Sequence, residues 1–187
     1  VRDVASDRSR QLTAIAHAAS AAGSALALVP LALIICVLLW RRGRMTSALT
    51  IAISLAGATA ISSLDKLLVA RPRPSVQHLE AVTSGSFPSG HTTQTTAFCL
   101  SLLLTFLATR PRRRLAVLAA LATAVAVNAV ALSRIYLGVH YPTDLAGGLV
   151  LGGGWTVIVC ALLSKAHHRD DTPGSGPLTL PHSAVIG

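Results

Sequence analysis

Hydrophobic residues gather into long runs that short polar segments separate. Stretches dominated by Ala, Leu, Val and Ile cover residues 20–40, 46–69, 91–109, 115–132 and 142–164. Each approaches the roughly 20 apolar residues that an α-helix needs to cross the hydrocarbon core of a bilayer. The pattern therefore predicts an all-α fold, a polytopic transmembrane helix bundle with five spans.

The polar ends of the chain predict that a single membrane domain lies between two polar terminal segments. Residues 1–19 mix charged and apolar side chains and are expected to form an interfacial N-terminal segment. Residues 20–165 would be one membrane domain. Residues 166–187 are rich in Pro, Gly and Ser, and we expect a disordered tail. Because the sequence starts at Val1 rather than Met, a sixth span that once preceded it stays an open alternative.

Composition favours the membrane over a soluble fold. Hydrophobic residues make up 52% of the chain and the mean hydropathy is +0.61. The alternative is a soluble all-helical protein with a buried core. Five such runs in 187 residues would leave too little polar surface to cover them.

The net charge of +9 is distributed unevenly. Basic clusters follow the first, third and fifth runs: Arg41, Arg42 and Arg44; Arg110, Arg112, Arg113 and Arg114; Lys165 and Arg169. Alternating spans would place all three on one side, and short Arg-rich loops face the cytoplasm. This pattern predicts a multi-pass cell-membrane protein. It argues against nucleic-acid binding, because the basic residues flank apolar runs instead of forming one face.

Three short motifs on the opposite side carry the candidate chemistry. The first is Lys66 followed, after six residues, by Arg73-Pro74. The second is Pro-Ser-Gly-His at positions 88–91. The third combines Ser133, Arg134, His140 and Asp144. Ionisable groups at membrane depth are costly and usually functional, and here they are clustered.

These motifs and their spacing resemble the signature of the type-2 phosphatidic acid phosphatase superfamily, which includes lipid phosphate phosphatases and vanadium haloperoxidases. The resemblance covers residues from about 23 to 164. It implies a membrane phosphatase, and the distribution of the basic clusters predicts that its active site is extracytoplasmic. The implied partners are a lipid phosphate or diphosphate substrate and the surrounding membrane lipids; the oligomeric state stays open.

Five residues are expected to bind the phosphate. The guanidinium forks of Arg73 and Arg134 can each hold two oxygens, and Lys66 adds a mobile charge. The turn at Ser89-Gly90 can aim backbone N–H groups at the anion, with the favourable dipole of a helix N-terminus behind them.

The resemblance divides acid–base work between two histidines. His140 would be the nucleophile that forms a phosphohistidine, with Asp144 fixing its tautomer. Pro142 between them predicts a turn followed by a helix start. His91 would be the general acid for the leaving alkoxide. Since three cations already neutralise the phosphate, we expect no metal and no cofactor; a His/His/Asp metal site is the rival interpretation.

Several alternatives stay open at this point. Undecaprenyl diphosphate, phosphatidic acid and phosphatidylglycerol phosphate are all compatible substrates, because the motifs bind the phosphate and not the lipid tail. A non-enzymatic transporter or binding protein with a phosphate site is the alternative function. Arg71 is as compatible with headgroup contact as with catalysis, and Cys36, Cys99 and Cys160 suit buried packing within apolar runs.

Overall fold

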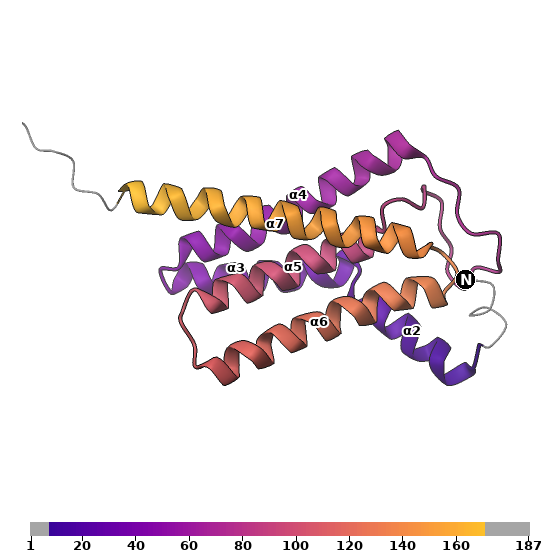
Figure 1. Cartoon of the computed structure of the whole chain (residues 1–187), viewed down its shortest axis with the longest axis horizontal. Coiled ribbons are helices and arrows are strands. Elements are labelled where there is room, and N and C mark those ends of the chain that lie inside the picture. Colours follow the sequence, from indigo (N-terminus) through magenta and orange to yellow (C-terminus); the bar gives the residue numbers. More distant parts are fainter. Residues whose placement is uncertain (1–7, 171–187) are drawn as a thin grey trace, which may run out of the picture.

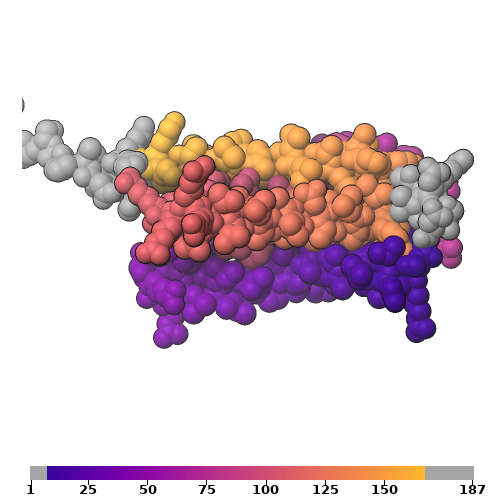
Figure 2. Space-filling view, turned by 60° about the horizontal axis from the view of Figure 1, so that its bottom comes forward, coloured from indigo at the N-terminus to yellow at the C-terminus, as the bar shows by residue number. Residues whose placement is uncertain are grey.

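The computed structural model describes residues 8–170 and contains six helices in that range. They are α2 (Arg10–Ala22), α3 (Ala25–Arg41), α4 (Met45–Val69), α5 (Gly90–Leu107), α6 (Arg113–Tyr136) and α7 (Pro142–Asp170). The longer helices run lengthwise beside one another (Figures 1 and 2). The all-α, polytopic prediction is confirmed.

Local sequence explains where most helices start and stop. Ser9 and Ser89 cap α2 and α5 by accepting hydrogen bonds from the backbone N–H groups of Leu12 and Thr92. Pro142 is the first residue of α7, where its missing N–H costs nothing. Ala70 ends α4 in the left-handed conformation, just ahead of Pro72.

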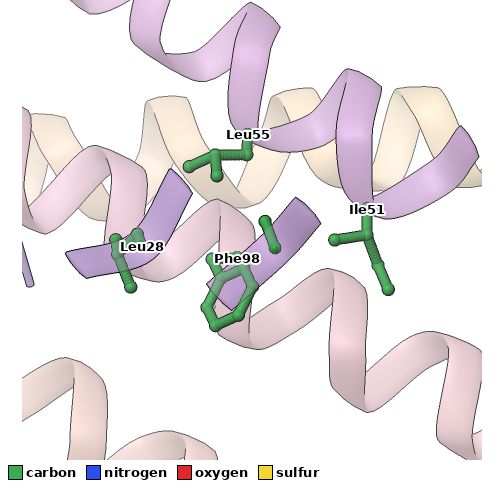
Figure 3. Close-up of a cluster of buried hydrophobic side chains, with 5 residues drawn as sticks. Leu28, Ile51, Leu55 and Phe98 are labelled. Atoms are coloured by element: carbon green, nitrogen blue, oxygen red, sulfur yellow. The ribbon is translucent and has the colours of Figure 1, made fainter. Parts of the chain in front are cut away.

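Helix α5 lies in the interior of the bundle, in contact with α3, α4, α6 and α7. One core cluster joins Leu28 and Ala32 of α3, Ile51 and Leu55 of α4, and Phe98 of α5 (Figure 3). Near its start α5 is polar: Thr92, Thr93, Thr95 and Thr96 are all buried. The Thr93 hydroxyl donates back to the Ser89 carbonyl at 2.9 Å, which satisfies its hydrogen-bonding need inside the helix.

Five spans were expected, and three or four of them meet a test of helix length and hydropathy. Helices α4, α6 and α7 are each long and apolar enough to cross a membrane, and α2 with α3 count as a fourth if this pair, bent by 46°, forms one span. Helix α5 does not meet that test. Its polar side chains face other helices rather than lipid, so it does not need a lipid-compatible composition.

Two boundaries also differ from expectation. Helix α2 continues to Ala22, and the chain turns at Gly23, where a Cβ atom would collide with Val130 of α6. Helix α7 continues to Asp170, into the segment expected to be a disordered tail. Residues 1–7 and 171–187, which include most of that tail, lie outside the described residues.

The loops divide between the two ends of the bundle. The α3–α4 and α5–α6 connections, with their arginines, lie at one end together with the end of α7 (left in Figure 1). The 70–89 and 137–141 loops lie at the other end, on the right. The three motifs therefore share one end of the bundle, opposite the basic clusters.

Candidate active site

His140 and Asp144 form the buried centre of the site. His140 lies in the loop before α7 and Asp144 in the first turn of that helix. The His140 Nδ1 is 3.3 Å from Asp144 Oδ2, which also accepts a hydrogen bond from the Tyr141 backbone N–H at 2.8 Å. A carboxylate beside Nδ1 favours the tautomer with the proton on that nitrogen, so the lone pair lies on Nε2.

The surroundings favour an uncharged His140. Burial lowers the pKa of His140, and although the hydrogen bond with Asp144 opposes this, the positive fields of Arg73 and Arg134 lower it further. The imidazole is therefore neutral at neutral pH. A neutral imidazole with a free Nε2 can act as a nucleophile.

Arg73 faces the reactive edge of that imidazole. Its Nη1 lies 3.5 Å from His140 Nε2 and donates to the Val139 carbonyl at 2.7 Å. Its Nε donates to the Ser84 carbonyl at 2.9 Å. These loop carbonyls fix the guanidinium in place, so a phosphate bound against Arg73 would also meet Nε2.

Lys66 stands over the start of α5. Its Nζ is 3.5 Å from the Ser84 hydroxyl, and a Cβ atom on Gly90 would lie 3.5 Å from the same nitrogen. The Ser89 backbone N–H donates to the Asp144 carbonyl at 3.0 Å. The second and third motifs are thus tied together, with the Lys66 ammonium group beside them.

The Ser89 hydroxyl is partly committed within the protein. It is fully buried and accepts a hydrogen bond from the Thr92 hydroxyl at 3.0 Å. Its own hydrogen is left to donate. Gly90 is the first residue of α5, so its backbone N–H is among those that the helix leaves without an internal partner.

His91 lies in the first turn of α5, half-buried. It is within electrostatic reach of Arg134, Glu80, His140 and Lys66. The structure therefore brings both histidines and all three expected cations to one end of the bundle. His91 belongs to this group by position, whereas His140 is held by direct contacts.

Arg134 has partners that the sequence did not predict. It lies in the last turn of α6 with a side chain only 2% exposed. Its Nη1 donates to the Glu80 carboxylate and to the Ser20 hydroxyl. Glu80 is the only glutamate in the chain, and a lone carboxylate in a loop beside three cations is the signal that could have identified it.

Arg71 is the second residue that the sequence left unassigned. Its Nη1 donates to Asp144 Oδ1 at 2.8 Å and to the Thr143 hydroxyl at 2.7 Å. Its guanidinium carbon lies 4.3 Å from the centre of the Tyr141 ring. Arg71 thus holds the oxygen of Asp144 that His140 does not use.

The comparisons with known proteins agree with this geometry. The family model described as PAP2 superfamily matches residues 47–168, well over half of the chain and all three motifs. The chain belongs to the PAP2 superfamily. A PAP2 protein with three or four candidate spans is a multi-pass membrane protein.

Characterised relatives of this PAP2 protein act on lipid-linked phosphates. It is 39% identical over 106 residues to decaprenylphosphoryl-5-phosphoribose phosphatase of Mycobacterium tuberculosis, covering 54% of this chain and 53% of that protein. It is 35% identical over 86 residues to lipid A 1-phosphatase of Rhizobium etli, covering 43% and 33%. The aligned segment thus spans about half the length of the first of these relatives.

Two solved structures share the fold of this PAP2 protein. The phosphatidylglycerolphosphate phosphatase of Bacillus subtilis superimposes with a TM-score of 0.73 at 24% identity, covering 90% of this chain and 82% of that one. LpxE of Aquifex aeolicus gives a TM-score of 0.69 at 21% identity, covering 86% and 92%. At these identities the likeness concerns the helical architecture.

Proposed function

We propose that this PAP2 protein is a membrane phosphatase that hydrolyses a phosphate monoester on a lipid through a phosphohistidine at His140. The observation that carries the proposal is the two-sided environment of this ring. Nδ1 faces Asp144, while Nε2 faces the Arg73 guanidinium. A phosphate held by Arg73 would lie in line for attack by that nitrogen.

In the first step, the Nε2 lone pair of His140 attacks phosphorus and the bond from phosphorus to the lipid oxygen breaks. His91, in its protonated form, gives its proton to the leaving oxygen. Asp144 stabilises the positive charge that develops on the His140 ring. Lys66, Arg73 and Arg134 neutralise the equatorial oxygens, where the transition state concentrates charge.

In the second step, a water attacks phosphorus on the phosphohistidine. His91, now neutral, takes a proton from that water, the P–N bond breaks, and its electron pair returns to Nε2. Inorganic phosphate leaves, and both histidines are restored to their starting protonation states. Each proton given up by His91 is thus recovered within the cycle.

The substrate we favour is a lipid-linked sugar phosphate or a phospholipid-type phosphate. The relatives that support this choice are named for decaprenylphosphoryl-5-phosphoribose and for lipid A. The site lies at an end of the bundle, where the neighbouring helices present many exposed leucines, isoleucines and valines. A lipid could lie against these helix faces while its phosphate reaches Lys66 and Arg73.

We place the site on the extracytoplasmic face of the cell membrane. The basic clusters at the opposite end of the bundle support this orientation, because short loops rich in Arg and Lys stay in the cytoplasm.

The mechanism we propose uses no metal. Within residues 8–170 there is no group of three or more His, Cys, Asp or Glu side chains arranged to hold an ion. Full activity in the presence of a chelator is the expected result. Activity that is lost in chelator and restored by Mg²⁺ would contradict the mechanism.

The test is phosphate release by the purified full chain in detergent, from a panel of a polyprenylphosphoryl sugar phosphate, lipid A 1-phosphate, phosphatidylglycerol phosphate and undecaprenyl diphosphate. His140→Ala should lower the rate at least about a thousandfold, because the nucleophile is lost. His91→Ala should also be slow on lipid phosphates. It should regain activity on p-nitrophenyl phosphate, whose good leaving group needs little protonation.

His17→Ala is the matched control, since His17 lies in α2 outside the motifs, and it should keep wild-type rates. Equal rescue of His91→Ala and His140→Ala by the aryl phosphate would contradict the assigned roles. Tight lipid phosphate binding with no release from any substrate would favour the alternative, a transporter or binding protein with a phosphate site.

A further inference from the structure

Glu80 places a second carboxylate beside the phosphate-binding cations. It lies in the 70–89 loop and forms an ion pair with Arg134 through Oε2. Its Oε1 accepts a hydrogen bond from the Ser20 hydroxyl of α2 at 3.0 Å. Ser20 in turn accepts from Arg134 Nη1, so that the three side chains form a closed ring of contacts.

The ring leaves one N–H donor of Arg134 without a partner. Nη1 is taken by Glu80 and Ser20, whereas Nε is buried and has no hydrogen-bond partner among the described residues. A buried guanidinium N–H without a partner is costly, and a phosphate oxygen would satisfy it. A phosphate bound at Arg134 Nε would thus share the guanidinium group with the Glu80 carboxylate.

The Glu80 carboxylate is ionised and lies within electrostatic reach of His91. Burial by itself would raise the pKa of Glu80, but the charge of Arg134, the hydrogen bonds from Arg134 and Ser20, and the nearby His91 together lower it. In the mechanism proposed above, His91 protonates the leaving oxygen. A carboxylate within electrostatic reach of His91 would thus lie near the leaving group of a bound substrate.

The other arginines of the site have little capacity for a second anionic group. Arg71 is paired with Asp144. Arg73 Nε and Nη2 donate to the carbonyls of Ser84 and Gly85. A second phosphate in the leaving group would therefore meet the negative charge of Glu80 with few free cations to offset it.

We propose that Glu80 makes this site selective for phosphate monoesters whose leaving group is uncharged, and disfavours diphosphates. The inference rests on the phosphatase function proposed above and narrows its substrate class. A sugar or glycerol hydroxyl next to the phosphate could donate a hydrogen bond to the carboxylate, whose side chain is 30% exposed. A diphosphate would place like charges together in a partly desolvated site, which costs binding and transition-state stabilisation alike.

The experiment compares farnesyl phosphate with farnesyl diphosphate, which share one tail and differ by one phosphate. The measured quantity is the ratio of kcat/KM for the monoester to kcat/KM for the diphosphate, with the full chain in detergent. Wild type should favour the monoester. Glu80→Gln should lower the ratio at least about tenfold, because it removes the charge but keeps a hydrogen-bond acceptor for Arg134.

Asp65→Asn is the matched control. Asp65 is a half-buried carboxylate next to Lys66 in the sequence, and the contacts of Glu80 with Arg134 and Ser20 do not involve it. Its removal should leave the ratio unchanged. Glu80→Asp, which keeps the charge, should keep the monoester preference even if both rates fall.

Two results would overturn the inference while leaving the phosphatase function intact. One is a wild type that prefers the diphosphate. The other is a Glu80→Gln variant that loses both activities by the same factor, which would limit Glu80 to holding Arg134 in place. If Glu80→Gln does not fold, a wild-type preference for the diphosphate would still overturn the inference.

Phosphate release from neither substrate would count against the proposed function instead. The role of Glu80 would then be tested separately by calorimetry, which measures the binding of methylphosphonate and of methylenediphosphonate to the wild type. Weaker binding of the diphosphonate is expected. Equal or tighter binding would overturn the role of Glu80.

Discussion

At the scale of single residues, the site is organised around one shared carboxylate. Asp144 gives one oxygen to His140 and Tyr141 and the other to Arg71. Arg71 forms an ion pair with the same carboxylate that would otherwise stabilise a protonated His140. Arg71 is therefore a positioning residue that also helps keep His140, the proposed nucleophile, neutral.

This arrangement predicts a pH effect. The proposed mechanism requires a neutral His140 for attack. The pKa of His140 lies below the ordinary histidine value, so kcat/KM should fall only as the pH drops through that lowered value. Arg71→Ala frees Asp144 to stabilise the imidazolium, which raises the pKa of His140. The acidic limb of the pH profile of kcat/KM should therefore move to higher pH.

Arg71→Lys should keep the limb near its wild-type position, since the charge remains although the contact with the Tyr141 ring changes. Arg114 lies at the opposite end of the bundle, so Arg114→Ala should change neither the acidic limb of the pH profile nor the rate of phosphate release. An unmoved limb in Arg71→Ala, with only a lower kcat, would restrict Arg71 to orienting Asp144.

At the scale of helices, the close approach of α5 and α7 positions two of the three motifs. Glycines of α7 face the threonines of α5 at the contact: a Cβ atom on Gly148 would lie 3.0 Å from the Ser89 carbonyl oxygen, and one on Gly152 would collide with the Thr93 carbonyl. Small residues let the two backbones meet, as in other membrane helix pairs. The Ser89 N–H thereby reaches the Asp144 carbonyl.

Substitution of these glycines tests that packing. Gly152→Ala should lower stability by about 1–3 kcal/mol, because the added methyl forces α7 away from α5. Gly154→Ala is the matched control, since a Cβ atom there meets nothing within 4 Å, and alanine favours a helix over glycine by about 1 kcal/mol. Thermal unfolding in detergent measures the stability of each variant, and phosphate release measures its activity. Equal stability of both variants would mean that the contact is looser than described.

At the scale of the whole molecule, the two ends of the bundle differ in charge and chemistry. The motifs lie at one end and the basic loops at the other (Figure 1). The proposed orientation places the 70–89 loop outside the cell. Exposed positions at the two ends allow this to be measured directly.

Ala81 in the 70–89 loop and Ala108 at the end of α5 are both exposed. In intact cells, Ala81→Cys should react with an impermeant thiol reagent, whereas Ala108→Cys should react only after permeabilisation. The unsubstituted chain, whose three cysteines are half-buried, gives the background. The reverse labelling pattern would place the site in the cytoplasm.

Local sequence was enough to predict much of the architecture and the candidate residues. The apolar runs predicted an all-helical membrane bundle, and Pro142 predicted the turn and helix start that bring His140 to Asp144. Ser89 predicted the start of α5. These features depend on neighbouring residues or on transfer from water to lipid, both of which a linear pattern records.

Only the tertiary structure showed which groups meet across the bundle. Glu80 and Ser20 reach Arg134 from a loop and from α2, and Arg71 reaches Asp144 from the start of that loop. The environment of α5 was also decided there, since α5 is surrounded by other helices and can be polar. Hydropathy reports how well a segment suits lipid, whereas packing determines whether lipid or protein surrounds it, and that depends on residues far away in the chain.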